Sequence, residues 1–285
     1  MSINWYPGHM KKTKETIAEN LKIVDLVIEV LDARIPLSSK NPDISKLAKN
    51  KKRLTVLNKV DLADEKEVEN WREYFIKNGI SDYVLAISAE KGTNLNELKK
   101  IVDEIYNEKL EKAKKKGLRK TEVRALIAGI PNVGKSKLIN KFAGKTKAKV
   151  GDKPGFTRGK QWVKASDKLE LLDTPGVLWP KFDDPEVGYS LAITGSIRDD
   201  ILPVEEVALV FINRLKKTGR LEQLRKAYNL ETDLENMENY KIMDALEERF
   251  GIIKNEETNY TKVSRFLLRD YRGGKIGRFS LETTE

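Results

Sequence analysis

Short apolar runs alternate along the first part of the chain with stretches whose apolar residues recur every three or four positions. The runs predict buried strands at 26–31, 53–57, 83–87 and 123–128, and a strand hairpin at 161–164 and 169–172. The helical spacing predicts helices within 11–22, 44–48, 68–75, 95–105 and 137–142. This alternation predicts an α/β fold with a doubly wound, mostly parallel sheet, whose loops gather at the carboxyl ends of the strands.

The pattern changes near residue 185, beyond which apolar residues mark helix faces and no strand is evident. We therefore expect one domain over 1–180, preceded by an N-terminal segment at 1–24, and a small all-helical domain over 181–285. Lys112 to Arg124 is strongly basic, and we expect a solvated connector there.

Composition restricts the classes of protein. The 285 residues include no cysteine, so disulfides and thiolate metal sites are excluded. No apolar run is long enough to span a membrane and the start is polar, so we expect a cytoplasmic protein. The net charge of +10 favours a polyanionic partner, most simply nucleic acid, although a lysine-rich surface can also serve solubility alone.

Residues 1–180 have a net charge of +13 and residues 181–285 a net charge of −3, but the basic residues of the second range are clustered. Two basic groups are separated by acidic residues between Glu231 and Glu257. The groups comprise Arg214, Lys216, Lys217, Arg220, Arg225 and Lys226, and then Lys262, Arg265, Arg269, Arg272, Lys275 and Arg278. Clusters separated in this way are candidates for surfaces that face phosphates.

The most specific pattern is Gly-Ile-Pro-Asn-Val-Gly-Lys-Ser at 129–136, between a predicted strand and a predicted helix. This context is typical of a phosphate-binding loop, because its backbone N–H groups and the helix N-terminus attract anions. Lys135 would reach the β- and γ-phosphates, and the Ser136 hydroxyl would hold Mg²⁺. The residues expected to bind nucleotide here are Asn132, Val133, Gly134, Lys135, Ser136 and Lys137. The alternative is a tight turn without a ligand.

Asn58-Lys59-Val60-Asp61 follows another predicted strand and is a candidate base reader. The Asp61 carboxylate can accept two hydrogen bonds from guanine, whereas adenine has no matching pair of donors. Asn58 would tie this loop to the phosphate loop, and the Lys59 stem would cover one face of the base. Backbone N–H groups at Ser88 and Ala89 could meet the guanine carbonyl, although this signal is weaker. An ordinary polar strand end is the alternative.

A third element would sense the γ-phosphate. Asp173-Thr174-Pro175-Gly176 ends a predicted strand, which suits a carboxylate near Mg²⁺ at Asp173 and an N–H facing the γ-phosphate at Gly176. Thr157, in a stretch rich in Gly, Pro and Lys that we expect to move, could complete the Mg²⁺ shell. Contacts to the γ-phosphate would then order these loops, and hydrolysis would release them. A plain surface threonine is the alternative for Thr157.

The chain contains all five GTPase sequence motifs, and the motifs that read the base precede the phosphate-binding loop. In this order of motifs the chain resembles the circularly permuted GTPases. The stretches at 5–10 and 32–36 and the helical tail make it similar to the ribosome biogenesis GTPase A, or YlqF-like, family over nearly its whole length. The resemblance implies a GTP/GDP-binding enzyme that assists late assembly of the large ribosomal subunit. Its C-terminal helical domain would contact ribosomal RNA.

The expected hydrolysis lacks one common component. Many GTPases carry a water-orienting glutamine after the Asp-x-x-Gly box, but this chain has Val177. We therefore predict slow hydrolysis alone and stimulation by a partner. Lys135 and Thr157 are candidate catalytic residues, and His9 is the candidate replacement for the glutamine, a position to which the resemblance also points. By similarity to related GTPases, Asn132 could instead help hold K⁺. Arg34 and Arg158 are further candidate charge donors, and the alternative for each is a pair with a carboxylate on the surface.

Three other interpretations stay open at this point. The chain could be an RNA-binding scaffold with a mainly structural GTP site, but the Lys135, Ser136, Thr157 and Asp173 set argues against it. It could be a permuted GTPase for the small subunit or another RNA particle, although such relatives usually carry an extra RNA-binding barrel. The third interpretation is a mitochondrial relative, which we disfavour because the sequence shows no arginine- and serine-rich leader.

Overall fold

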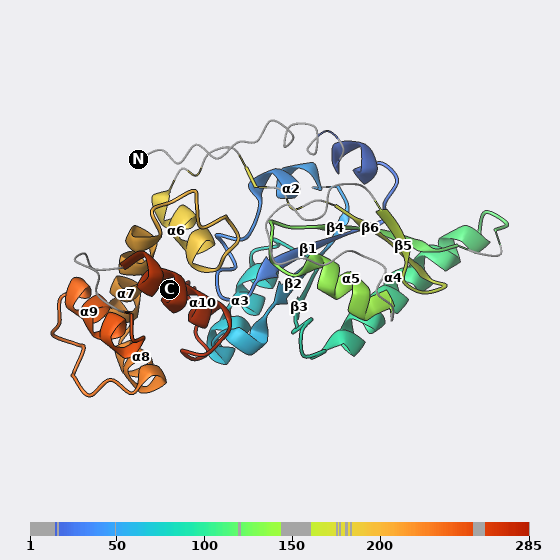
Figure 1. The fold of residues 1–285 in the computed structure, drawn as a ribbon. Helices are drawn as coiled ribbons and strands as arrows, with labels where there is room; N and C mark the ends of the chain where they lie inside the picture. Colours follow the sequence, from blue (N-terminus) through green and yellow to red (C-terminus); the bar gives the residue numbers. More distant parts are fainter. Residues whose placement is uncertain are drawn as a thin grey trace.

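The computed structural model describes residues 15, 17–48, 50–118, 121–143, 161–174, 176, 178–179, 182, 184–252 and 260–284. At its centre is a six-stranded sheet in the order β3-β2-β1-β4-β6-β5 (Figure 1). The strands are β1 (Leu26–Asp32), β2 (Lys52–Asn58), β3 (Tyr83–Ala86), β4 (Val123–Ala128), β5 (Gln161–Lys164) and β6 (Leu169–Asp173). All neighbours are parallel except β5 and β6, which form the predicted antiparallel pair.

Helices cover both faces of the sheet, as the alternating pattern predicted. They are α2 (Pro42–Leu47), α3 (Glu65–Lys77), α4 (Leu95–Lys114) and α5 (Lys135–Ala143). One face packs against α4 and α5 through a core that includes Ile28, Val56, Leu98 and Leu138. The other packs against α3, α2 and the helical turn at 17–21. Because both faces are buried, β1 is apolar at almost every position rather than alternating.

Local sequence explains where these helices begin and end. The Asp64 side chain accepts hydrogen bonds from the Lys66 and Glu67 backbone N–H groups and so caps α3, which ends before Asn78-Gly79 as predicted. The prediction of a connector from Lys112 onward was wrong at its start, because α4 continues to Lys114. Ala113 is buried and extends the apolar face of that helix, which a charge-based interpretation overlooks.

The remaining described helices follow the sheet strands in the sequence and pack together beside them (Figure 1). They are α6 (Pro185–Ile193), α7 (Val204–Lys217), α8 (Leu221–Tyr228), α9 (Asn239–Arg249) and α10 (Tyr260–Arg272). Helix α7 packs against α6, α9 and α10, and the rings of Phe211 and Tyr271 meet with their centroids 4.7 Å apart. None of the helices in the described ranges is both long and apolar enough to cross a bilayer.

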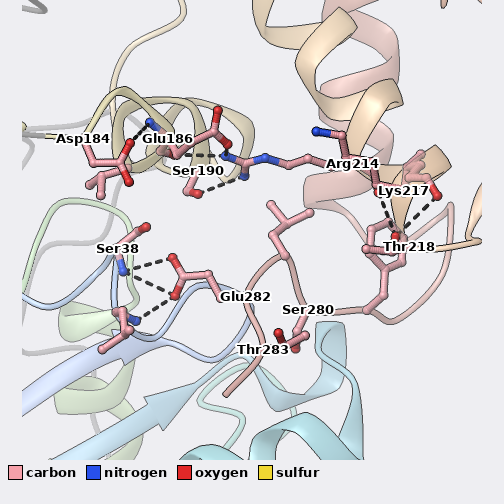
Figure 2. Close-up of a pocket in the computed structure, with 15 residues that line it drawn as sticks. Ser38, Asp184, Glu186, Ser190, Arg214, Lys217, Thr218, Ser280, Glu282 and Thr283 are labelled. Carbon is pink, nitrogen blue, oxygen red and sulfur yellow. Dashed lines mark hydrogen bonds and ion pairs between the residues drawn. The ribbon is translucent and has the colours of Figure 1, made fainter. Parts of the chain in front are cut away.

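The C-terminal segment 276–284 returns from the helices to the sheet part. Leu281 N–H donates to the Arg34 carbonyl at 2.8 Å, and Phe279 N–H donates to the Leu62 carbonyl at 3.2 Å. The Glu282 carboxylate accepts from the Leu37 and Ser38 N–H groups, beside a cavity of about 470 Å³ lined by this segment, α6 and α7 (Figure 2). The segment thus joins the helices to the loops after β1 and β2.

Candidate functional site

The phosphate loop connects β4 to α5, at the position where the sheet reverses its winding direction. The chain proceeds from β1 to β2 and β3 on one side, and β4 is followed by β6 and β5 on the other. A crevice at the carboxyl ends of the strands is expected at such a point. Glycine is required in this loop, since a Cβ on Gly134 would collide with Asn58 Nδ2 and one on Gly129 would lie 2.5 Å from the Val30 carbonyl oxygen.

Lys135 lies at the start of α5 and is folded back over its own loop. Its ammonium donates to the Ile130 carbonyl at 2.8 Å and to the Gly129 carbonyl at 3.1 Å. Burial lowers the pKa of Lys135 to about 8, and the charge of Asp173 opposes that shift. Within the described part of the chain, this buried ammonium has neutral carbonyls as its hydrogen-bond acceptors, which suits it to receive an anion at this loop.

Asp173 ends β6 beside the phosphate loop and is almost fully buried. Burial raises its pKa, whereas Lys135 and a hydrogen bond from the Ser136 side chain oppose the rise. Its Oδ1 atom is buried and has no hydrogen-bond partner among the described residues. A buried carboxylate oxygen beside a serine hydroxyl is the donor set that a phosphate-bound Mg²⁺ uses, so the residues present fit that ion.

The loop after β6 approaches the phosphate loop closely. A Cβ on Gly176 would lie 2.7 Å from the Pro131 nitrogen, so only glycine allows this approach. The Thr174 hydroxyl donates to the Ile127 carbonyl at 2.7 Å and fixes the start of this loop on β4. His9, Thr157 and Arg158, which the sequence made candidates for hydrolysis, lie outside the described residues, as does Val177, which stands where many GTPases carry a glutamine.

Asn58 joins the phosphate loop to the loop after β3. Its Nδ2 donates to the Val133 carbonyl at 2.7 Å, and its Oδ1 accepts from Ala89 N–H at 2.9 Å. The predicted contact between the loop after β2 and the phosphate loop is therefore present, and Asn58 also joins both to Ala89 in the loop after β3. Ser88 is buried, and its hydroxyl accepts from Lys91 N–H at 3.0 Å.

Asp61 lies in the short 3₁₀ helix η1 (Val60–Leu62), which directly follows β2 and Lys59. The Oδ1 atom of Asp61 is buried without a hydrogen-bond partner among the described residues. Such an atom is costly unless a ligand supplies a donor, which is the role expected of a carboxylate that reads guanine. The structure thus brings Asn58 and Asp61 to the same edge of the sheet as Lys135 and Asp173.

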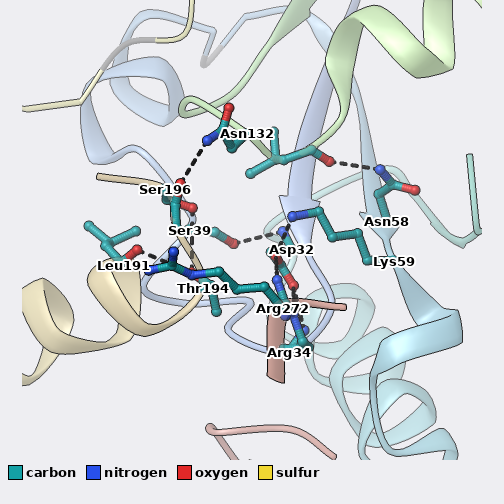
Figure 3. A network of polar contacts seen from close by, with 12 residues as sticks. Asp32, Arg34, Ser39, Asn58, Lys59, Asn132, Leu191, Thr194, Ser196 and Arg272 are labelled. Carbon is teal, nitrogen blue, oxygen red and sulfur yellow. Dashed lines mark hydrogen bonds and ion pairs between the residues drawn. The ribbon is translucent and has the colours of Figure 1, made fainter. Parts of the chain in front are cut away.

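Two residues of the phosphate loop region have protein partners that the sequence did not indicate. Asn132 Nδ2 donates to the Gly195 carbonyl at 2.7 Å, in the turn that follows α6 (Figure 3). Lys137 Nζ lies 2.5 Å from Glu90 Oε2, so its ammonium points to the loop after β3. Both contacts join segments far apart in the chain, and no local pattern could have predicted them.

The sequence also missed the environment of Asp32 and Arg34. They form a buried bidentate ion pair, and Lys59 Nζ lies 3.0 Å from Asp32 Oδ2. Arg34 is 1% exposed, so it is a buried structural partner of Asp32 rather than a charge donor reaching outward. The sequence did contain one signal for this site, which is a polar residue, Asp32, at the carboxyl end of β1.

Several side chains of the two predicted basic clusters have partners within the protein. Arg214 pairs with Glu186, Arg220 pairs with Asp64, and Arg272 pairs with Asp199. Arg278 donates to the Val60 carbonyl at 3.0 Å, and Lys216 donates to the Met237 carbonyl at 3.0 Å. These contacts do not test whether the two clusters face phosphates, so that expectation stays a prediction. On α10, the exposed basic side chains are Lys262, Arg265 and Arg269, which lie three and four positions apart on one helix face.

The strand, glycine loop and helix around Lys135, with Asp173 beside them, form the phosphate site of a P-loop GTPase. The Asn58–Asp61 loop lies at the same edge of the sheet but comes earlier in the chain, so the class is a circularly permuted P-loop GTPase. A sequence model described as "50S ribosome-binding GTPase" matches residues 124–244. Ribosome biogenesis GTPase A of Bacillus licheniformis is 45% identical over 286 residues, covering 100% of this chain and 99% of that protein. The Priestia megaterium protein of that name is 44% identical, covering 99% and 97%. The chain belongs to the ribosome biogenesis GTPase A family, and it is an enzyme that binds and hydrolyses GTP.

A solved structure shares the fold. The crystal structure of GNP-bound YlqF from Thermotoga maritima aligns with a TM-score of 0.64 at 24% identity, covering 96% of this chain and 99% of that one. The alignment extends over both the sheet and the helices, in agreement with the permuted fold class predicted from the sequence.

Proposed function

We propose that this GTPase is a switch that binds a late precursor of the large ribosomal subunit when it carries GTP and leaves after hydrolysis. The observation that carries the proposal is that Asp61 and Asp173, which follow or end parallel strands at the same edge of the sheet, each have a buried Oδ1 atom without a hydrogen-bond partner among the described residues. One would read guanine and the other would serve the metal. The place of action would be the cytoplasm, where the precursor is assembled.

The nucleotide would lie along the edge formed by the loops after β2, β3, β4 and β6. Asn58, Lys59, Asp61, Ser88 and Ala89 would surround the base. Backbone N–H groups from Asn132 to Lys137 would hold the phosphates, with the Lys135 ammonium moving from its loop carbonyls onto them. Ser136 and Thr157 would hold Mg²⁺, and Asp173 would bind its water. The metal would neutralise charge that develops on the phosphates.

Hydrolysis would be slow in isolation, because Val177 cannot orient water. His9 would supply that function when the subunit is bound. Asn132 would help hold a K⁺ ion at the phosphates, and equal turnover in sodium and potassium salts would reject that role.

The switch would reach the helices by two routes. The Gly176 loop would follow the γ-phosphate and leads within a few residues to α6. Asn132 supports a second route, because it already contacts the turn after α6. The division at residue 180 would therefore separate a nucleotide-binding part, 1–180, from a ribosome-binding part, 181–285. Ribosomal RNA would meet the exposed face of α10 at Lys262, Arg265 and Arg269.

The decisive experiment is GTP turnover with and without purified large subunits, with small subunits as the control. Stimulation by large subunits alone, lost in His9→Ala with unchanged GDP affinity, would support the proposal. Negligible turnover under both conditions would favour a scaffold with a structural GTP site. Stimulation by small subunits alone would indicate a different RNA particle.

A further inference from the structure

Asp32 lies outside the base-reading tetrapeptide but directly beside it. It is the last residue of β1 and is in register with Asn58, the last residue of β2. Its side chain is 0% exposed. Its backbone N–H donates to Ser39 Oγ at 3.0 Å, and the next residue, Ala33, donates its N–H to the Asn58 carbonyl at 2.8 Å. The carboxylate is therefore held in a fixed place at the start of the reading loop.

Lys59 has a conformation that directs its side chain toward this carboxylate. Its φ of 68° and ψ of 33° lie in the left-handed region, which is uncommon for a residue other than glycine. The ammonium ends 3.0 Å from Asp32 Oδ2, and the side chain is 22% exposed (Figure 3). Burial lowers the pKa of Lys59, and Asp32 opposes that shift. The ion pair thus holds the ammonium of a mostly buried lysine in place.

Arg34 is the second cation that pairs with Asp32, and its burial determines which cation would move if Asp32 lost its charge. Arg34 Nε and Nη2 donate to the two Asp32 oxygens at 2.9 and 2.7 Å, and its Nη1 is buried without a hydrogen-bond partner among the described residues. Two cations therefore share one carboxylate. If that charge were lost, Arg34 could not leave, because it is 1% exposed beneath the Tyr271 ring. Lys59, the more exposed cation, would move toward solvent.

We infer that Asp32 is a positioning residue for guanine recognition, which holds the Lys59 ammonium so that the Lys59 stem lies against the face of the purine. This inference rests on the proposed role of Asn58–Asp61 in reading the base. It assigns to the carboxyl end of β1 a part in nucleotide affinity, and it gives a role to the buried carboxylate that lies there beside two cations.

The structure offers a matched pair of variants. Asp32→Asn and Arg34→Met both abolish the buried bidentate ion pair, so both should lower the thermal unfolding midpoint. Only Asp32→Asn also removes the anchor of Lys59. In Arg34→Met the carboxylate still accepts from the Arg34 backbone N–H, 3.1 Å from Oδ1, and still pairs with Lys59. A purely structural role would make the two variants alike in nucleotide binding.

The measurement is the Kd for GDP in a double-mutant cycle with Lys59→Met. We expect Asp32→Asn and Lys59→Met each to raise the Kd by about tenfold, and the double variant to raise it by about tenfold rather than a hundredfold. Arg34→Met should change the Kd by less than about twofold and should combine multiplicatively with Lys59→Met. If Asp32→Asn does not fold, Asp32→Ser replaces it in the same cycle.

Three results would overturn the inference. They are an unchanged Kd in the Asp32 variant, independent effects of the Asp32 and Lys59 variants, and an equal loss in Arg34→Met. Failure of the underlying proposal looks different, since wild-type protein would then bind ADP as well as GDP. If wild type prefers GDP and Asp61→Asn abolishes that preference, the base-reading proposal stands whatever the Asp32 variants show.

Discussion

Asn132 in the phosphate loop donates a hydrogen bond from Nδ2 to the Gly195 carbonyl oxygen at 2.7 Å, 63 positions further along the chain. Gly195 lies in the turn after α6, and a Cβ there would lie 3.1 Å from Arg272 Nε. Arg272 belongs to α10 and donates to the Ile193 and Ala192 carbonyls at 3.0 and 2.7 Å (Figure 3). A single amide therefore connects the nucleotide loop to the last helix through one turn.

This contact predicts that nucleotide state alters the turn after α6. Hydrogen exchange of peptides covering 191–199 should differ between the GDP-bound protein and the protein bound to a non-hydrolysable GTP analogue. The difference should be reduced in Asn132→Ala, because the turn then loses its hydrogen bond to the phosphate loop. Peptides from α9 should exchange equally in both states. An unchanged difference in Asn132→Ala would assign the coupling to the Gly176 loop instead.

Arg272 should be important for stability. Arg272→Met removes hydrogen bonds to two carbonyls at the end of α6 and the ion pair with Asp199, and should lower the free energy of unfolding by about 2–3 kcal/mol. Arg269→Met on the same helix is the control. Arg269 is 66% exposed, so its loss should cost less than about 1 kcal/mol. Urea denaturation of both variants tests the difference, and equal losses would contradict it.

Nucleotide binding should take up a proton under mildly alkaline conditions. Burial lowers the pKa of Lys135 to about 8 in the ligand-free protein, and a bound phosphate would raise it. Below this pKa the ammonium is already protonated, so binding near pH 7 should take up almost no proton. Above it, part of the population must be protonated, so GDP affinity should fall as pH rises from 8 toward 9.

Calorimetric titrations of GDP in two buffers of different ionisation enthalpy would measure this uptake. The observed enthalpy should be independent of the buffer at pH 7 and should depend on it at pH 8.5. Buffer independence at both values would show that Lys135 stays fully protonated in the free protein.

Asp61→Asn should change base preference. The amide would lose affinity for guanine, whose N–H groups it cannot both satisfy, and would gain affinity for xanthine, whose exocyclic carbonyl can accept from it. We expect the Kd for GDP to rise by at least about a hundredfold and that for XDP to fall. Competition against a fluorescent nucleotide measures both, and a retained preference for GDP would remove Asp61 from the base site.

The exposed face of α10 should contribute salt-dependent binding to large subunits. Replacing Lys262, Arg265 and Arg269 with alanine should weaken binding and reduce the slope of log K against log salt by about one per lost phosphate contact. The control replaces Lys112, Lys114 and Lys116, which are exposed at and beyond the end of α4, and so removes the same charge. Equal losses in both triple variants would indicate a general charge effect rather than a surface on α10.

The sequence by itself determined the elements and the order of the motifs. The strands β1, β2, β3 and β4 were evident as apolar runs, because a strand covered on both faces needs apolar side chains throughout, and β5 and β6 were evident as a hairpin. The loop from Gly129 to Ser136 was evident because its glycines meet local steric demands, and Asp61 and Asp173 because polar groups at strand ends are local signals. The motif set also predicted that Asn58 contacts the phosphate loop, although the structure alone identified the Val133 carbonyl as its acceptor.

Only the tertiary structure decided which distant groups meet. The packing of separate segments produces the ion pairs of Asp32 with Arg34 and Lys59. It also produces the hydrogen bond from Asn132 to Gly195 and the hydrogen bond from Arg272 to the Ala192 carbonyl at the end of α6. The sequence does not show whether a charged side chain is buried. Basic residues that face solvent and basic residues that donate to carbonyl groups therefore looked alike in the two clusters. Burial and partner choice are properties of the packed chain, because contacts between residues far apart in sequence determine them.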